Sequence, residues 1–462
     1  MAFKLNNAKL VALLFTSLLE IFFFGGMQFG WVALVFILKL EGVFKNLCIS
    51  ESPSNTTLVT SEDSCVPQDE QFNLIFSIGI AVSTIGTIVH GQLYMSFEIK
   101  RIRTISMPLG VAGILLLAFT SPEIPWLLLP GITAVSVAGT SLLVSNFKQV
   151  PFLLSRGSSI YIGLLNGCYD SSVLTFMLVK KLYEDGTDQK LSFVGVAISF
   201  IVISGVCTIL HPSPNDKNGT NENSPLNRDY AISKKEVEEA RRQSTSDLAS
   251  DSWSIVDIIS HPLFISHVLW VTAVLLKYYY FIGSANEAMK QLLHTENMVS
   301  YFSDVMTITM VGSLVPSFIA GCTINIMDKM FTGNMRMVVP LALTSGFVII
   351  LSALAFIPTA TVLYVDFVVV TFLRAFVYTT NMEFIRSAFS VKYLSLIYGL
   401  ITSVCGIFTM TQYGLFAWRA SSDTAITQVN VFLLCLSTAS LCHPILVVYR
   451  HKRQKNKIDI TF

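Results

Sequence analysis

The feature that most constrains the fold of this chain is a series of apolar segments, each about 20 residues or longer. A helix rises about 1.5 Å per residue, so each segment is long enough to cross a hydrocarbon core about 30 Å thick. In lipid, each segment must pair its own backbone N–H and C=O groups, as an α-helix does. We therefore predict an all-α membrane protein with twelve transmembrane helices, near residues 10–38, 72–95, 102–121, 124–146, 157–179, 191–211, 262–283, 301–327, 336–357, 359–384, 393–418 and 428–449.

The composition excludes most soluble protein classes. Of the 462 residues, 52% are hydrophobic and only 13% are charged, about half the charged share of an average soluble domain. The net charge is +1, so nothing indicates binding to nucleic acid. The sequence carries no phosphate-binding glycine loop, zinc-ligand spacing or nucleophile elbow. We predict that the protein is no enzyme, uses no cofactor or metal, and handles a small-molecule substrate in the lipid bilayer without an obligate protein partner.

A polar segment divides the apolar segments into two groups of six. We predict an N-terminal six-helix bundle at residues 1–211, a cytoplasmic linker at 212–260, a C-terminal six-helix bundle at 261–450 and a basic cytoplasmic tail at 451–462. Within the linker, the charge pattern of residues 229–243 predicts a solvated helix. Two six-helix halves joined by a long polar linker are typical of carriers that open a central site to each side of the membrane in turn.

Lysine and arginine residues are distributed unevenly over the predicted loops. With both termini inside, the inner segments hold roughly three times as many of them as the outer segments, which is the bias of cytoplasmic loops. The first apolar segment is also longer than the core of a cleavable signal peptide, which spans about 7–15 residues. We predict a multi-pass protein of the plasma membrane with cytoplasmic N- and C-termini.

The first outer loop carries two features of an extracellular segment. Asn55 begins a glycosylation sequon, and we predict that it carries a glycan. The loop also contains Cys48 and Cys65, which an oxidising environment favours as a disulfide; two free thiols are the alternative. A second sequon at Asn218 lies in the predicted cytoplasmic linker and is expected to stay unmodified.

Ionisable residues within predicted helices are candidates for function, because an unpaired charge there is costly, and three of them are Glu20, Asp170 and Arg374. Glu20 precedes Gly25 and Gly26, which favour a bend in the first helix. Asp170 lies in a polar cluster of the fifth helix, and Arg374 in the tenth is expected to pair with Glu20 or Asp170. We predict that all three contribute to substrate binding; purely structural pairing between helices is the alternative.

Amide and tyrosine side chains recur in the same helices as these charges, several of them at spacings that place them on one face. Such groups suit a flat ligand with hydrogen-bonding edges. For part of the tyrosine run at 278–280, an aromatic belt at the membrane interface is the alternative. The predicted substrate-binding residues are Glu20, Asn166, Tyr169, Asp170, Tyr279, Asn286, Arg374, Tyr378 and Asn381.

Short motifs spread over nearly the whole chain, apart from the linker, resemble solute carrier family 43, a branch of the major facilitator superfamily. They are Leu18-Leu19-Glu20, Phe29-Gly30-Trp31, Gln68-Asp69-Glu70, Asn73-Leu74-Ile75-Phe76, Leu165 to Ser172, Phe281-Ile282-Gly283, Arg374-Ala375-Phe376 and His443-Pro444. The resemblance implies the major facilitator fold, with a central cavity formed mainly by the first, fourth, seventh and tenth helices and with the second, fifth, eighth and eleventh alongside.

Members of this family carry large neutral amino acids or nucleobases, and the motifs at 166–172 and 281–283 look more like the nucleobase carrier. The resemblance therefore implies facilitative, sodium-independent transport of purine nucleobases, such as adenine, guanine and hypoxanthine, by alternating access. Three alternatives stay open. They are a carrier of large neutral amino acids, a carrier coupled to protons through Glu20 or Asp170, and a membrane scaffold or sensor without transport activity.

The resemblance also implies gating residues at the inner ends of the second and eighth helices. The superfamily pattern Gly-x-x-x-Asp-Arg begins at Gly91, but Met95 and Ser96 stand where Asp and Arg are expected. In the second half, Asp328 and Lys329 keep an acid next to a base. We predict that Gly91, Asp328 and Lys329 act in gating. The departure at residues 95 and 96 predicts a weaker gate on its side; a diverged member with altered substrate or activity is the alternative.

Overall fold

The computed structural model describes residues 7–48, 66–154, 157–212, 254–293 and 295–461. Within these residues the regular structure is helical throughout, and twelve helical segments are long and apolar enough to cross a membrane. The predicted all-α fold with twelve transmembrane helices is confirmed. Asn55, Cys65, Asn218 and the helix predicted at 229–243 lie outside the described residues, so the glycan, the disulfide and that helix stay predictions.

The helices lie close to the segments predicted from hydropathy. The first half contains α1 (Asn7–Glu20), α2 (Trp31–Leu40), α3 (Val66–Ser96), α4 (Ile99–Ala118), α5 (Leu128–Leu153), α6 (Ser158–Ser171), α7 (Leu174–Glu184) and α8 (Gln189–Leu210). The second half contains α11 (Pro262–Leu293), α12 (Glu296–Val311), α13 (Leu314–Met330), α14 (Val338–Leu354), α15 (Ala360–Ala388), α16 (Leu394–Thr409), α17 (Gln412–Ala420), α18 (Asp423–Ala439) and α19 (Cys442–Thr461). Several spans contain a short interruption, such as those between α1 and α2 and between α6 and α7.

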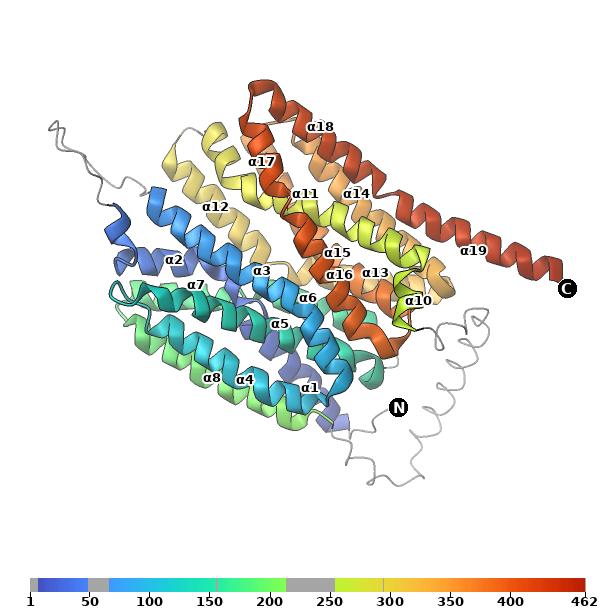
Figure 1. Ribbon diagram of the computed structural model, residues 1–462, viewed down its shortest axis with the longest axis horizontal. Coiled ribbons are helices and arrows are strands. Elements are labelled where there is room, and N and C mark those ends of the chain that lie inside the picture. Colours follow the sequence, from blue (N-terminus) through green and yellow to red (C-terminus); the bar gives the residue numbers. More distant parts are fainter. Residues whose placement is uncertain (1–6, 49–65, 155–156, 213–253, 294, 462) are drawn as a thin grey trace.

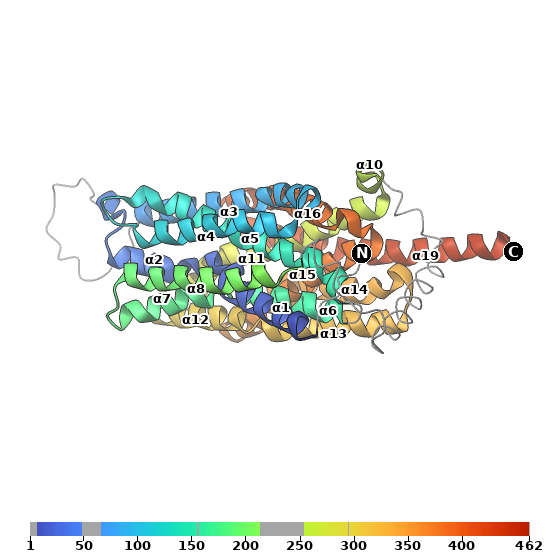
Figure 2. The same ribbon diagram turned by 90° about the horizontal axis from the view of Figure 1, so that it is seen from below.

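Two elements refine the predicted boundaries. The short helix α10 (Ile255–Ile259) begins inside the segment predicted as linker, where Ser254 and Asp257 form a capping box. The backbone N–H of Ser254 bonds to the Asp257 carboxylate and lowers the pKa of that carboxyl below its usual value. At the C-terminal end of the second half, α19 continues from the spanning part to Thr461 (Figure 2), so residues 451–461 extend the last helix.

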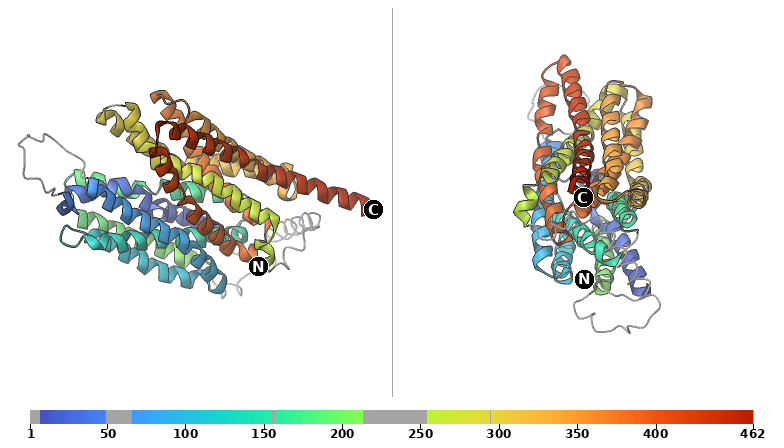
Figure 3. Two further views of the ribbon diagram at one scale, coloured as in Figure 1. Left: turned by 45° about the horizontal axis from the view of Figure 1, so that its top comes forward. Right: turned by 90° about the vertical axis from the view of Figure 1, so that its right-hand side faces the viewer.

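The two halves form two groups of helices that converge at one end of the molecule. The helix α10, which follows the linker, lies at this end together with the start of α1, and we refer to it as the linker end. Figure 1 and Figure 3 show the helices of the two halves closest together there and diverging toward the opposite end. Two pairs of helices form the main seams between the halves: α3 with α16, and α6 with α13.

Glycines permit the close approach of the halves at both seams. A Cβ on Gly399 of α16 would lie 2.3 Å from the carbonyl oxygen of Thr87 on α3. In the second seam, a Cβ on Gly163 of α6 would lie 2.4 Å from the carbonyl oxygen of Ser317 on α13. Because no real Cβ atom approaches a backbone oxygen so closely, only glycine allows this spacing, as in other tightly packed membrane helices.

The Gly399→Ala variant tests this seam. We expect it to lower the free energy of unfolding by about 1–3 kcal/mol, because the added methyl group must push α3 and α16 apart. The measurement is thermal unfolding of the detergent-solubilised protein, with Gly195→Ala on α8 as the control. A Cβ on Gly195 meets no atom within 4 Å, so that variant should be as stable as the wild type or slightly more stable. Equal stability of the two variants would contradict this account.

Candidate functional site

A cavity lies between the two halves, and residues of both line it. The lining residues are Gln28, Phe29, Ile80, Ser83, Thr84, Thr87, Thr140, Leu143, Asn166, Tyr169, Asp170, Val271, Leu275, Tyr279, Tyr378, Asn381, Tyr398, Thr402 and Gly406. They come from the first, second, fourth, fifth, seventh, tenth and eleventh spanning segments. The empty volume, including the space at the opening, is about 840 Å³.

The first spanning segment is interrupted where it borders this cavity. After α1, a π-helical turn (η1, Ile21–Gly25) and a 3-10 turn (η2, Met27–Gly30) replace the regular helix. The backbone N–H of Gly26 donates to Ser172 Oγ at 2.8 Å, at the interruption between α6 and α7. A Cβ at Gly26 would lie 2.5 Å from the Tyr169 carbonyl oxygen, so this position requires glycine. The bend predicted from Gly25 and Gly26 is thus confirmed. Interrupted helices are typical of carrier binding sites.

One buried ion pair joins the two halves beside the cavity. Arg374 on α15 donates from Nε to Asp170 Oδ1 on α6 at 2.7 Å, and from Nη1 to the Tyr278 hydroxyl on α11 at 2.6 Å. Its guanidinium lies 4.7 Å from the centroid of the Phe29 ring. The expectation that Arg374 pairs with a carboxylate of another helix is confirmed, and the partner is Asp170. The pair is charge-neutral as a whole.

The cavity wall combines tyrosine rings with hydrogen-bonding groups. The hydroxyls of Tyr279 and Tyr378 lie 3.1 Å apart, and Gln28 Nε2 donates to the Tyr169 hydroxyl at 3.2 Å. Gln28 Oε1 and Asp170 Oδ2 are buried, and neither has a hydrogen-bond partner in the described part of the chain. Because buried polar atoms are nearly always paired, these two oxygens are acceptors whose donors do not come from the described side chains.

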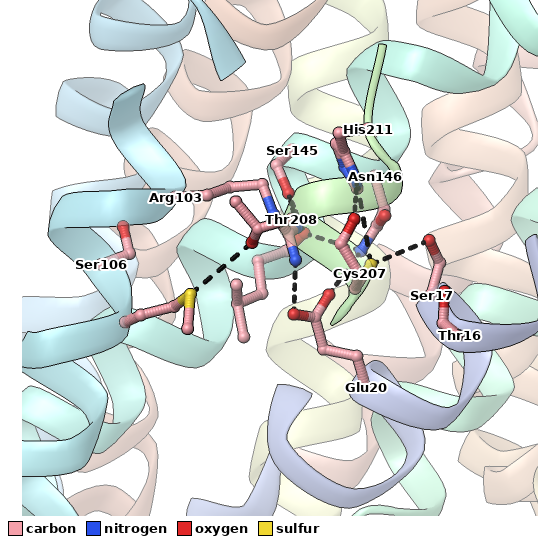
Figure 4. A network of polar contacts seen from close by, with 12 residues as sticks. Thr16, Ser17, Glu20, Arg103, Ser106, Ser145, Asn146, Cys207, Thr208 and His211 are labelled. Carbon is pink, nitrogen blue, oxygen red and sulfur yellow. Dashed lines mark hydrogen bonds and ion pairs between the residues drawn. The ribbon is translucent and has the colours of Figure 1, made fainter. Parts of the chain in front are cut away.

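Glu20 takes part in a different network, away from the cavity. Figure 4 shows its carboxylate bonded to Arg103 of α4, and both side chains are fully buried. Arg103 also donates to Ser145 Oγ at 2.7 Å and to Thr208 Oγ1 at 3.0 Å, so the network ties α1, α4, α5 and α8 together. His211, at the end of α8, is fully buried beside this network, with Nδ1 2.7 Å from the Cys207 carbonyl oxygen. Glu20 therefore has a structural partner and does not line the cavity.

The predicted asparagines differ in their surroundings. Asn166 lines the cavity and donates from Nδ2 to the Ile162 carbonyl oxygen at 3.2 Å. Asn381 also lines it, with its Oδ1 2.9 Å from His267 Nε2. Asn286 belongs to α11, seven residues after Tyr279, and its side chain lies outside what the structure describes.

Sequence reasoning missed several residues of the site. Gln28 and Phe29 lie two and three residues after Gly26 in the first span, and a polar residue in so apolar a segment was a signal for Gln28. Arg103 is the second residue of the span predicted at 102–121 and was not among the candidates; the structure buries it completely. Tyr278, the hydrogen-bond partner of Arg374, belongs to the tyrosine run for which an interfacial belt was the alternative.

The predicted gating residues lie at the linker end. A Cβ on Gly91 would lie 2.5 Å from the Ser395 carbonyl oxygen, so this glycine forms part of the α3–α16 seam. Asp328 lies 3.3 Å from Arg336 and 3.5 Å from Ser159 Oγ of the other half, whereas Lys329 is exposed. The acid–base contact of Asp328 is therefore with Arg336, because successive residues of a helix point in different directions. The gating roles themselves stay predictions.

Known proteins support the family resemblance and the fold. The chain is 26% identical to equilibrative nucleobase transporter 1 of Bos taurus, over 97% of this chain and 98% of that protein. It is 31% identical to large neutral amino acids transporter small subunit 3 of Homo sapiens, over 37% of this chain and 31% of that protein. No protein-family model matches the sequence. These similarities confirm the resemblance to solute carrier family 43.

Solved structures of major facilitator transporters share the fold. The proton:xylose symporter XylE bound to 6-bromo-6-deoxy-D-glucose has a TM-score of 0.63 and 12% identity, over 96% of this chain and 95% of that one. A bacterial homologue of the iron transporter ferroportin, in an outward-facing state, has a TM-score of 0.59 and 12% identity, over 96% and 98%. The chain is a multi-pass membrane protein with the major facilitator fold.

A double-mutant cycle tests the ion pair between the halves. We expect Asp170→Asn and Arg374→Gln each to lower the free energy of unfolding by about 3–5 kcal/mol, because each leaves a buried charge unpaired. The double variant should cost far less than the sum of the two, since neither charge remains. Thermal unfolding in detergent measures all three.

An exposed pair on α7 provides the control for this cycle. Asp185 lies 3.5 Å from Lys181 at the surface, so Asp185→Asn should cost at most about 1 kcal/mol. Additive losses at residues 170 and 374 would show that these two side chains are not coupled.

Proposed function

We propose that this protein is a facilitative, sodium-independent carrier of purine nucleobases, such as adenine, guanine and hypoxanthine, in the plasma membrane. The chain is a transporter by its fold and its relatives, and the relative that it matches over nearly its full length is named for nucleobase transport. At 26% identity the name of a relative does not decide the substrate. The argument for the substrate therefore comes from the chemistry of the cavity.

The observation that carries the proposal is the neutrality of the cavity. Among its described lining residues, Asp170 is the one ionisable carboxylate or ammonium-type group, and Arg374 already neutralises it. A zwitterionic amino acid would need a free carboxylate for its ammonium group and a free cation for its carboxylate. A purine base needs neither. It is flat and uncharged, and it requires stacking surfaces and hydrogen bonds in the plane of the ring.

The side chains of the cavity supply what a purine requires. Tyr169, Tyr279 and Tyr378 offer ring surfaces from both halves. Gln28 Oε1 and Asp170 Oδ2 offer acceptors for the N–H groups at the edge of a base. Binding a base would pair these two buried oxygens, which would otherwise remain unsatisfied.

The proposed mechanism is alternating access. With the linker end in the cytoplasm, as the distribution of basic residues predicts, the seams of α3 with α16 and α6 with α13 close the cytoplasmic side. Rocking of the two halves about the cavity would open these seams and close the opposite side. We propose that the base moves down its own gradient, without sodium or ATP as an energy source.

A carrier of large neutral amino acids is the second candidate function. The human relative with that name is 31% identical to this chain, although over 37% of its length. For this function, rearrangement of the Asp170–Arg374 pair would have to free both charges for the zwitterion. A membrane scaffold or sensor without transport activity is a third possibility, which the uptake measurement below also tests.

Uptake of radiolabelled adenine and leucine by cells expressing the chain tests the substrate. We expect saturable adenine uptake that persists when choline replaces sodium, and no leucine uptake above background. Asp170→Ala should lower the transport efficiency for adenine by about 1–3 kcal/mol, because a buried polar partner is lost. Tyr378→Ala should also lower uptake, whereas Tyr364→Ala, on an exposed part of the same helix, should not.

The same assay separates the alternatives. Leucine uptake without adenine uptake would establish the amino-acid carrier, and uptake of neither would favour the scaffold. Accumulation of adenine above its outside concentration when the medium is acidified would reject a uniporter in favour of a proton-coupled carrier.

Glycosylation tests the proposed orientation. If the loop after the first span is extracellular, the protein from plasma-membrane fractions should shift to lower mass on treatment with a glycosidase. Asn55→Gln should abolish that shift. The sequon at Asn218 is the matched control, because Asn218→Gln should change nothing if the linker is cytoplasmic. The opposite pattern would invert the topology.

A further inference from the structure

A chain of hydrogen bonds leads from the cavity into the second half of the protein. Asn381 of α15 lines the cavity, and its Oδ1 lies 2.9 Å from His267 Nε2 on α11. His267 Nδ1 lies 3.1 Å from His443 Nε2 on α19, and His443 Nδ1 lies 2.9 Å from Ser266 Oγ on α11. His267 is fully buried and His443 is 3% exposed. Neither histidine is among the residues that line the cavity.

The chemistry of the groups determines which atom donates and which accepts in each of these hydrogen bonds. An amide oxygen only accepts hydrogen bonds, so His267 Nε2 must carry the proton and donate to Asn381. A second proton on His267 would place a charge on a fully buried ring, where no carboxylate bonds to it in the described part of the chain. His267 Nδ1 is therefore an acceptor and His443 Nε2 a donor. A neutral His443 that donates from Nε2 accepts at Nδ1, so the single Ser266 hydroxyl proton goes to His443 Nδ1 at 2.9 Å rather than to the Leu263 carbonyl oxygen, which lies 3.2 Å away.

Aromatic packing holds the central ring of the chain in place. The His267 ring stacks on Phe384, with centroids 4.2 Å apart and an angle of 23° between the planes. Its other neighbour is Trp270, at 5.4 Å and 18°. Because rings on both sides restrict its rotation, His267 keeps Nε2 directed at Asn381. The amide oxygen of Asn381 is thereby occupied, and its Nδ2 makes no hydrogen bond within the described residues.

We propose that Ser266, His443 and His267 are positioning residues that fix the amide of Asn381, so that its N–H₂ group serves the ligand. The site would then select a base that presents a hydrogen-bond acceptor, such as a ring nitrogen, toward α15. Its N–H edge would face the acceptors Gln28 Oε1 and Asp170 Oδ2 of the first half. This inference rests on the proposed function and adds which half of the protein donates hydrogen bonds to the base and which half accepts them.

Competition between adenine and its deaza analogues tests the inference. In 1-, 3- and 7-deazaadenine, a C–H group replaces one ring-nitrogen acceptor. We expect at least one of them to inhibit radiolabelled adenine uptake about tenfold more weakly than adenine itself does, because it leaves the Asn381 donor unpaired. Asn381→Asp keeps the shape of the side chain but removes the N–H donor. It should therefore bring the ratio between the inhibition constants of that analogue and of adenine to within about twofold of one.

Ser266, His443 and His267 form a hydrogen-bond relay to Asn381, and the variant that decides the role of this relay is His443→Phe. It removes the donor to His267 Nδ1 without touching the cavity, so His267 can take its other tautomer and the amide of Asn381 can turn over. The ratio between the inhibition constants of the deaza analogue and of adenine should then fall to within about twofold of one. His443→Gln retains an N–H donor and should retain the discrimination. Ser266→Ala, a smaller change in the same relay, serves if His443→Phe does not reach the cell surface.

Ser345→Ala is the matched control for damage to this region. Ser345 Oγ accepts from Trp270 Nε1 at 3.0 Å beside the relay but takes no part in it, so this variant should keep the wild-type ratio. A merely structural role of His443 would weaken adenine and its analogue alike and leave their ratio unchanged. That result, or equal inhibition by all four bases in the wild type, would overturn the inference. Absence of adenine uptake by the wild type would instead contradict the proposed function, and the inference would fall with it.

Discussion

The arrangement of the cavity depends on a charge pair that crosses from one half of the bundle to the other. Asp170 and Arg374 are both at least nine-tenths buried, and their separation in a membrane interior would cost several kcal/mol. The pair therefore couples α6 to α15 next to the cavity. Tyr278 and Phe29 complete the surroundings of the guanidinium from α11 and the interrupted first span. A motion that opens the seams has to keep this pair together or provide new partners.

A second buried pair has the opposite effect, because it lies within one half. Glu20 and Arg103 link α1, α4, α5 and α8 through hydrogen bonds that leave the charges no exposure. Such a network favours movement of the first half as a rigid body. The interruption after Glu20 then lets Gln28 and Phe29 take positions in the cavity wall that a continuous helix would not give them. A tied network within the first half, glycine seams and an ion pair between the halves are compatible with the alternating access proposed above.

The same two pairs determine the electrostatic character of the site. Since Arg374 neutralises Asp170 and Arg103 neutralises Glu20, the described cavity wall offers a ligand mainly rings and uncharged hydrogen-bonding groups. Its unpaired acceptors belong to the first half and its amide donor to the second. A ligand that fits this polarity touches both halves at once, and its binding free energy can therefore depend on how the halves are placed.

By itself, the sequence determined the spans, because the bilayer requires long apolar helices and hydropathy records them directly. It also marked Glu20, Asp170 and Arg374, since a charge within such a segment is rare and needs a reason. It could not assign their partners. Helix periodicity describes one helix at a time, whereas the pairing of Glu20 with Arg103 and of Asp170 with Arg374 depends on which helices pack together. For the same reason the relay from His443 to Asn381 became visible only in the tertiary structure: His267 and His443 are 176 residues apart in the chain and 3.1 Å apart in space.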